Sequence, residues 1–276
     1  MTVRQALIEG AKRLGSVPTP FLDAIVLLSH VTGYSKEKLF SSYPEEISVD
    51  LGEDFNRLIN LRLKGTPVSY IRRKKEFYGL EFTVGPGVLV PRPETELLVE
   101  AVADLASQGA CLRSVHDACT GSGCVAISIK RQRPHLEISA SDVSDEALSY
   151  FRSNSVTLLE EELVSYKSDL LESVPGTFDL IAANPPYLTS ESWRHMAARQ
   201  WPEPRLALDG GWDGLALYRD LIPQSSSRLK KGGFLFLEAD PSQFETIEKL
   251  LVQNGFHTHI IYKDLAGHKR VIRAEI

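Results

Sequence analysis

From residue 112 onward, short apolar segments typical of strands alternate with segments typical of helices, and no other feature limits the possible folds as strongly. Such alternation predicts an α/β doubly wound fold, a parallel sheet with helices on both faces. Strands are predicted at 112–118, 136–141, 163–167, 178–183, 234–238, 256–261 and 270–274, and helices at 124–133, 145–158, 214–230 and 241–253. Because residues 262–269 are too few for a helical crossover, we expect the last two strands to form an antiparallel hairpin.

The first part of the chain has helical periodicity instead. Apolar residues recur at helical spacing from Val3 to Leu14, and Pro20 is placed to open a second helix. Ser35 is placed to cap a short helix, and the longest helix is predicted from Asp50 to Lys64. These segments predict a small helical domain.

A strong turn signal follows the predicted helices. Gly85-Pro86-Gly87 lies between apolar segments at 77–84 and 88–90, which predicts a β-hairpin with its turn at these three residues. We therefore expect three parts, a helical domain at 1–75, a hairpin linker at 76–90 and the α/β domain at 91–276.

A glycine-rich loop, residues 117–123, follows the first strand of the predicted sheet. Gly121 and Gly123 allow a tight turn close to a ligand, and Asp142 follows the second strand about 20 residues on. A carboxylate at that position can accept hydrogen bonds from the two hydroxyls of an adenosine ribose. Nicotinamide dinucleotides and S-adenosylmethionine both carry that ribose, so the loop alone does not separate them.

Two details favour S-adenosylmethionine. Asp117 places a carboxylate where the phosphates of a dinucleotide would approach, and it suits the ammonium group of S-adenosylmethionine instead. The loop after the fourth strand offers no hydride-transfer group. Asp169-Leu170 can bind the adenine, although Asp169 can equally be a helix cap or a solvated acid. The predicted cofactor-binding residues are Asp117, Cys119, Thr120, Gly121, Ser122, Gly123, Asp142, Asp169, Leu170 and Asn184.

Four residues, Asn184-Pro185-Pro186-Tyr187, follow the strand predicted at 178–183, where ligands bind in open α/β sheets. Pro185 restricts Asn184 to an extended conformation, and the two prolines remove two N–H donors. The result is a rigid corner with two acceptors, the Asn184 side-chain carbonyl and the Pro185 main-chain carbonyl, and one aromatic face from Tyr187. This corner suits a planar NH2 group. We predict all four as catalytic residues for alkylating an amide or amine nitrogen; a simple turn is the alternative.

Two further segments have open roles. Arg92, Glu94 and Glu96 either shape the mouth of the acceptor site or pair with one another at the start of a helix. Trp193, Trp201 and Glu203-Pro204 either form a lid over the acceptor or pack their segment onto the sheet.

Charge and composition exclude several classes of protein. The chain has 43% apolar and 24% charged residues, its longest apolar runs are too short to cross a bilayer, and its start lacks the layout of a signal peptide. Three cysteines, Cys111, Cys119 and Cys124, predict reduced thiols in a cytoplasmic protein and no metal site. Residues 1–80 carry a net charge of +3 and the remainder −8, so we expect no direct binding of nucleic acid and no membrane partner.

Nearly the whole chain resembles the peptide chain release factor N(5)-glutamine methyltransferases. The segments that carry the resemblance are Pro67–Tyr70, Glu76–Gly79, Val88–Glu96, Asp117–Gly123, Asn184–Tyr187 and Glu203-Pro204. The Asn-Pro-Pro-Tyr motif is also found in methyltransferases of DNA and RNA amines, so it specifies the reaction and not the substrate. One residue departs from the family pattern: Cys119 stands where the family usually has glycine. If this position needs a positive φ, the Cβ costs about 1 kcal/mol.

The resemblance implies a Rossmann-like, seven-stranded class I methyltransferase sheet. It implies an enzyme that methylates the glutamine of the Gly-Gly-Gln motif in class I release factors, modulating translation termination, with S-adenosylmethionine as donor and S-adenosylhomocysteine as product. The N-terminal helices are then expected to help hold the protein substrate, and the enzyme is expected to be a monomer.

Three other functions stay open at this point. A methyltransferase for an exocyclic amine of a nucleic-acid base uses the same four residues, but the chain lacks a basic catalytic face and a long target-recognition insert. A regulator that binds S-adenosylmethionine without catalysis has no need for an intact acceptor corner. A nicotinamide dehydrogenase depends only on the glycine spacing.

Overall fold

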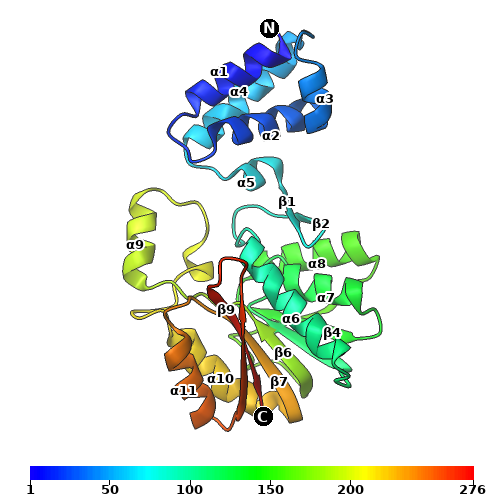
Figure 1. Ribbon diagram of the computed structural model, residues 1–276, viewed down its shortest axis with the longest axis vertical. Helices are drawn as coiled ribbons and strands as arrows, with labels where there is room; N and C mark the ends of the chain where they lie inside the picture. Colours follow the sequence, from blue (N-terminus) through cyan, green and yellow to red (C-terminus); the bar gives the residue numbers. More distant parts are fainter. The chain divides into compact units, whose positions relative to one another are not determined.

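The computed structural model describes the backbone of residues 1–276 and every side chain except that of Thr258, and it divides the chain into two compact units. The first unit contains residues 1–74 and 199–202, and the second contains residues 75–198 and 203–276 (Figure 1). Among the described residues, no helix combines the length and the apolar character needed to cross a bilayer.

The first unit consists of helices packed around one apolar core. They are α1 (Val3–Arg13), α2 (Pro20–Thr32), α3 (Lys36–Ser41), α4 (Val49–Leu63) and α5 (Val68–Arg72). Side chains of Thr2, Ser35 and Ser48 cap three of them, and Gly33 ends α2 in the left-handed conformation. Core side chains come from α1 through α4, as the helical periodicity predicted; the core includes Leu7, Leu14, Leu27, Leu28, Leu39, Phe55 and Ile59.

The hairpin that follows has its turn in a different place from the prediction. Strands β1 (Lys74–Phe77) and β2 (Leu80–Thr83) pair around Tyr78 and Gly79, whose φ angles are 52° and 72°. Two left-handed residues match the twist of a hairpin. The predicted hairpin around residues 85–87 is therefore wrong. The chain does turn there, with the Val88 N–H donating to the Gly85 carbonyl, but residues 88–90 form no strand. The pattern misled because tyrosine rarely adopts a positive φ. Here the Tyr78 N–H also donates to Glu96 at 2.9 Å.

The second unit contains a seven-stranded sheet in the order β5-β4-β3-β6-β7-β9-β8. The first five of these strands are parallel, and β9 is antiparallel to both of its neighbours. The strands are β3 (Ser114–Ala118), β4 (Glu137–Asp142), β5 (Val164–Lys167), β6 (Phe178–Ala183), β7 (Leu229–Glu238), β8 (Thr258–Lys263) and β9 (Lys269–Glu275). The predicted α/β fold and its final antiparallel hairpin are confirmed.

Helices cover both faces of this sheet (Figure 1). One face carries α6 (Glu96–Ser107), α7 (Cys124–Gln132) and α8 (Asp145–Leu159), and the other carries α10 (Ala216–Arg228) and α11 (Phe244–Gln253). A further helix, α9 (Ser190–Ala198), was not predicted. It has no buried residues, so its sequence lacks the apolar stripe by which helices are recognised.

The parallel strands bring three carboxylate side chains and one amide side chain to one edge. Strand β3 lies between β4 and β6, with Ala118 opposite Ser141 and Ala183, and Ala183 is opposite Leu237 of β7. These strands therefore end together, and the residues at their ends are Asp117, Asp142, Asn184 and Glu238.

Candidate functional site

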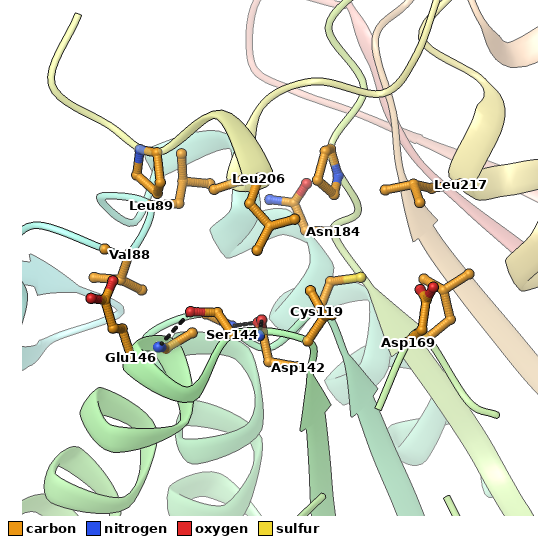
Figure 2. Close-up of a pocket in the computed structure, with 18 of the residues that line it drawn as sticks. Val88, Leu89, Cys119, Asp142, Ser144, Glu146, Asp169, Asn184, Leu206 and Leu217 are labelled. Carbon is orange, nitrogen blue, oxygen red and sulfur yellow. Dashed lines mark hydrogen bonds between the residues drawn. The ribbon is translucent and has the colours of Figure 1, made fainter. Parts of the chain in front are cut away.

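A cavity of about 340 Å³ lies at this edge of the sheet. Asn184 and Asp142 face it from opposite sides, with Cys119 between them (Figure 2). Three further segments contribute to its wall, through Gly87, Val88 and Leu89, through Val143, Ser144, Glu146 and Ala147, and through Pro204, Leu206 and Ala207. A smaller cavity of about 40 Å³ shares Cys119, Gly121 and Asn184 with it, and its lining includes Asp117, Thr120 and Ser122.

The glycine-rich loop turns at three residues with positive φ. Cys119, Gly121 and Gly123 have φ angles of 57°, 57° and 84°. A Cβ on Gly123 would lie 2.6 Å from the Phe151 ring, so close packing of α7 against α8 requires glycine there. A Cβ on Gly121 would meet only Val88, at 3.6 Å, so the space next to Gly121 is open to a ligand.

Cys119 has a positive φ, so the condition under which its Cβ is costly is met. Replacing Cys119 with glycine removes the Cβ strain, although it gives the unfolded chain more freedom. We expect a small net gain, about 0.5 kcal/mol, in the free energy of unfolding, measured by urea denaturation. Cys111, which is exposed and has no positive φ, is the control. Cys111→Gly should lower stability; a loss of stability in Cys119→Gly would contradict the assignment of strain.

The Asp142 carboxylate is held in place by two backbone N–H groups and can still accept further hydrogen bonds. Its Oδ2 accepts the Gly121 N–H at 2.9 Å and its Oδ1 accepts the Ser144 N–H at 2.9 Å. Each carboxylate oxygen has a second lone pair, so both can also accept a hydroxyl. Burial raises the pKa of Asp142, and these backbone donors oppose that rise.

Asp117 is almost fully buried, with 1% of its surface exposed. Its Oδ2 accepts the Thr120 hydroxyl at 2.7 Å and the Ala126 N–H at 3.2 Å, which ties the loop to the start of α7. Burial raises its pKa to about 7. A cation bound next to such a buried carboxyl group would strongly stabilise its ionised form.

Asp169 and Leu170 both line the large cavity. Leu170 has a φ of 49°, and its carbonyl accepts the Ser141 hydroxyl at 2.9 Å. Ser141 in turn lies 2.9 Å from His116 Nε2, and burial lowers the pKa of His116 to about 3. The hydroxyl proton of Ser141 is used by Leu170, so Nε2 of the neutral His116 donates to Ser141.

The four residues predicted as catalytic are placed differently from one another. Asn184 and Pro186 line the large cavity, and Pro185 is buried. Asn184 Nδ2 donates to Thr95 Oγ1 at 3.0 Å. Tyr187 packs against the apolar core, and its carbonyl accepts Gln243 Nε2 at 2.9 Å.

A loop with glycines at 210 and 214 packs against the Pro186-Tyr187 backbone. A Cβ on Gly210 would lie 2.5 Å from the Pro186 carbonyl oxygen and 2.9 Å from Tyr187 Cα. The Gly210 N–H donates to the Leu188 carbonyl at 2.8 Å, and the Leu188 N–H donates to the Leu208 carbonyl at 3.0 Å. The backbone around Gly210 therefore packs directly against the backbone of residues 186–188, and the contact leaves no room for a side chain at position 210.

The segment after α9 closes one side of the cavity. Glu203 is 4% exposed, accepts the Val90 N–H at 2.8 Å and forms an ion pair with Arg92. Pro204 and Leu206 line the cavity. The Arg205 guanidinium lies over the Trp193 ring, with its Cζ 4.7 Å from the ring centre. Arg92 thus pairs with Glu203 and lines the smaller cavity, so of the two alternatives left open for it the structure favours a place at the mouth of the site.

Comparison with known proteins decides the family. Residues 5–72 match the PrmC N-terminal domain, and residues 93–201 match the methyltransferase small domain. The release factor glutamine methyltransferase of Neisseria gonorrhoeae is 38% identical over 262 residues, 94% of each chain. That of Moorella thermoacetica is 35% identical over 279 residues, covering 99% of this chain and 98% of its own. The chain belongs to the release factor glutamine methyltransferase family.

Solved structures support the same fold. A ribosomal protein L11 methylase from Lactobacillus delbrueckii is 25% identical and has a TM-score of 0.50, covering 69% of this chain and 82% of its own. A Thermus thermophilus 16S rRNA methyltransferase has a TM-score of 0.55 at 22% identity, covering 73% and 49% of the two chains. The predicted methyltransferase fold is confirmed, and the chain is a methyltransferase of the release factor glutamine methyltransferase family.

Two residues of this methyltransferase site were missed by the sequence reasoning. Thr95 accepts a hydrogen bond from Asn184. Glu238 ends β7, one residue after Leu237, which is the register partner of Ala183. Thr95 was hidden among the charged residues of the 91–96 segment. A signal for Glu238 was present, because a single acid ends an apolar strand at the ligand-binding edge.

Proposed function

We propose that the enzyme transfers a methyl group from S-adenosylmethionine to the side-chain amide nitrogen of the glutamine in the Gly-Gly-Gln motif of class I release factors. The observation that carries this proposal is the orientation of Asn184. Because its Nδ2 is held by Thr95, its Oδ1 is left to accept an N–H from an amide in the cavity.

The residues of the cavity fit S-adenosylmethionine. A volume of about 340 Å³ lies within the range of small-molecule sites. Asp142 would accept the ribose hydroxyls, Asp169 and Leu170 would bind the adenine, and Asp117 would face the ammonium group. Cys119, Thr120, Gly121, Ser122 and Gly123 would provide the loop around the methionine part.

The bound cofactor supplies a methyl group on a positively charged sulfur. An amide nitrogen is a weak nucleophile because its lone pair is delocalised into the carbonyl. Asn184 Oδ1 and the Pro185 carbonyl would accept its two N–H bonds, which favours a pyramidal nitrogen as positive charge develops. With the cofactor bound, the new N–C bond would be made as its S–C bond is broken, the electron pair would stay on sulfur, and the extra proton would leave to solvent. Positioning supplies much of the acceleration.

Substitution of Asp117 should separate stability from cofactor binding. The unfolded carboxyl titrates near 3.8 and the folded one near 7, so ionised Asp117 increasingly destabilises the fold between these pH values. Asp117→Asn keeps an acceptor for Thr120 and Ala126 without the charge. We expect a higher melting temperature at pH 8, a smaller difference at pH 5, and cofactor affinity about 10-fold lower. A lower melting temperature at pH 8 would contradict this account.

Partner and location follow from the same proposal. We expect a cytoplasmic monomer whose residues 1–75 help hold the release factor and which does not bind nucleic acid directly. Support comes from the net charge of −8 on residues 81–276, because a phosphate backbone would be repelled by such a domain.

The test uses the full-length enzyme, labelled S-adenosylmethionine and purified class I release factors. We expect one methyl group on the glutamine of Gly-Gly-Gln, located by mass spectrometry, and no labelling of a release factor in which that glutamine is alanine. Label on plain DNA or RNA, and none on the release factor, would establish the alternative, methylation of an exocyclic base amine.

A further inference from the structure

The peptide group that joins Leu170 to Leu171 is held at both of its polar ends by side chains from other parts of the fold. Its carbonyl, that of Leu170, accepts the Ser141 hydroxyl at 2.9 Å. Its N–H, that of Leu171, donates to Gln224 Oε1 at 2.8 Å. Ser141 lies in β4 and Gln224 in α10. The peptide group cannot rotate without losing one of these hydrogen bonds, so the two side chains set its position.

Leu170 needs this support because of its own backbone conformation. Its φ of 49° lies in the left-handed region, which a leucine side chain disfavours. A residue keeps such a conformation only where its surroundings impose it. Leu170 is also a wall residue of the large cavity, so a relaxed conformation at this position would move the cavity wall.

A buried histidine fixes the direction of the Ser141 hydroxyl. His116 and Ser141 are both fully buried, and His116 Nε2 lies 2.9 Å from Ser141 Oγ. Because Ser141 donates its proton to Leu170, the Nε2–H group donates to Ser141, and Nδ1 accepts the Ser139 hydroxyl at 2.9 Å. Ser141 therefore receives one hydrogen bond and donates another, which holds its hydroxyl proton on the Leu170 carbonyl.

We propose that Ser141 and Gln224 are positioning residues for the adenine of S-adenosylmethionine. They hold the 170–171 peptide so that Leu170 forms a wall for the adenine ring before the cofactor binds, and binding then does not have to order that wall. The inference rests on the proposed function for one assignment, the place of the adenine beside Asp169 and Leu170. It does not depend on which nitrogen is methylated.

The first experiment removes each hydrogen bond in turn from the full-length enzyme. Ser141→Ala deprives the Leu170 carbonyl of its donor, and Gln224→Met keeps the length of the side chain without the acceptor. We expect each variant to bind S-adenosylhomocysteine about 5-fold more weakly in calorimetric titrations, the usual contribution of one hydrogen bond. On the release factor, KM for S-adenosylmethionine should rise while kcat stays within twofold. Wild-type affinity in either variant would overturn the proposal for that residue.

Two further variants separate the hydrogen bonds from the loss of a polar group. Gln224→Glu keeps an oxygen that can accept the Leu171 N–H and should bind S-adenosylhomocysteine within twofold of wild type. Ser128→Ala removes a hydroxyl that is also fully buried but has no hydrogen-bond partner among the residues that the structure describes, so the affinity should not change. The proposal fails if Gln224→Glu loses as much affinity as Gln224→Met, or if Ser128→Ala loses as much as Ser141→Ala.

A ligand without the base distinguishes positioning of the adenine from general damage to the fold. S-ribosylhomocysteine keeps the ribose and the amino acid part of S-adenosylhomocysteine but lacks adenine. Its affinity, measured by competition, should change less than twofold in Ser141→Ala and Gln224→Met. Equal losses for the two ligands would overturn the proposal, because the peptide would then support the whole cavity. These binding measurements do not involve the release factor, so methylation of a different acceptor would refute the proposed function and leave this inference in place.

Discussion

Asn184→Ala is expected to lower turnover by about 100-fold or more while S-adenosylhomocysteine still binds. The substitution removes the side-chain acceptor that would orient the glutamine amide and stabilise the positive charge that develops on its nitrogen. Asn184 sits at the end of β6 and lines the cavity, but the carboxylates expected to hold the ribose and ammonium groups lie on other strands. Initial rates on a release factor and calorimetric titration of the product measure the two effects separately.

Asn184→Gln is the matched control for position. It keeps the amide chemistry but moves it by one methylene, about 1.5 Å, and a displacement of that size costs on the order of 100-fold. Loss of turnover in both variants would show that the place of the acceptor matters as well as its presence. Wild-type turnover in Asn184→Ala would refute the assignment of Asn184 as the acceptor.

Asp142→Asn is expected to weaken binding of S-adenosylhomocysteine by about 100-fold. The carboxylate accepts the N–H groups of Gly121 and Ser144 with one oxygen each. An amide NH2 would face one of these donors, so the variant loses an acceptor for the ribose and places two donors in opposition. The glycine-rich loop would shift as well, and calorimetry at pH 7.5 measures the combined loss.

Asp145→Asn is the control for charge. Asp145 is three residues further along, does not line the cavity, has a side chain that is 73% exposed and pairs with Lys167. Removing this charge should change the affinity less than twofold, because exposed ion pairs contribute little. Similar losses in the two variants would mean that long-range charge, and not contact with the ribose, explains the effect of Asp142.

The fold was predictable because its elements repeat a simple pattern. Short apolar strands separated by helical segments specify a parallel sheet, and the spacing between β8 and β9 leaves only an antiparallel pair. The predicted strand ends also placed Asp117, Asp142 and Asn184 at one edge of the sheet. Local pattern and tertiary structure agree over most of the sheet, but β7 begins at Leu229, where a helix was predicted to continue to residue 230.

Elsewhere the sequence pattern was not sufficient. The turn at Tyr78 requires a positive φ that its residue type disfavours, and α9 is held without a buried stripe. The hydrogen bond from Asn184 to Thr95 joins residues 89 positions apart in sequence, so no local spacing encodes it. The direction of a hydrogen bond depends on which donor and acceptor atoms lie next to each other, and only the structure shows this.

The glycine at 210 has a consequence for protein engineering. Any larger residue there would push directly on Pro186 and Tyr187, so changes in that loop would alter reactivity and fold together. Leu206 lines the pocket close to Asn184, and its side chain is not among the atoms that meet a Cβ at Gly210, so its side chain can be varied with less effect on that support. Libraries aimed at accepting amides other than glutamine should therefore randomise position 206 and leave 210 fixed.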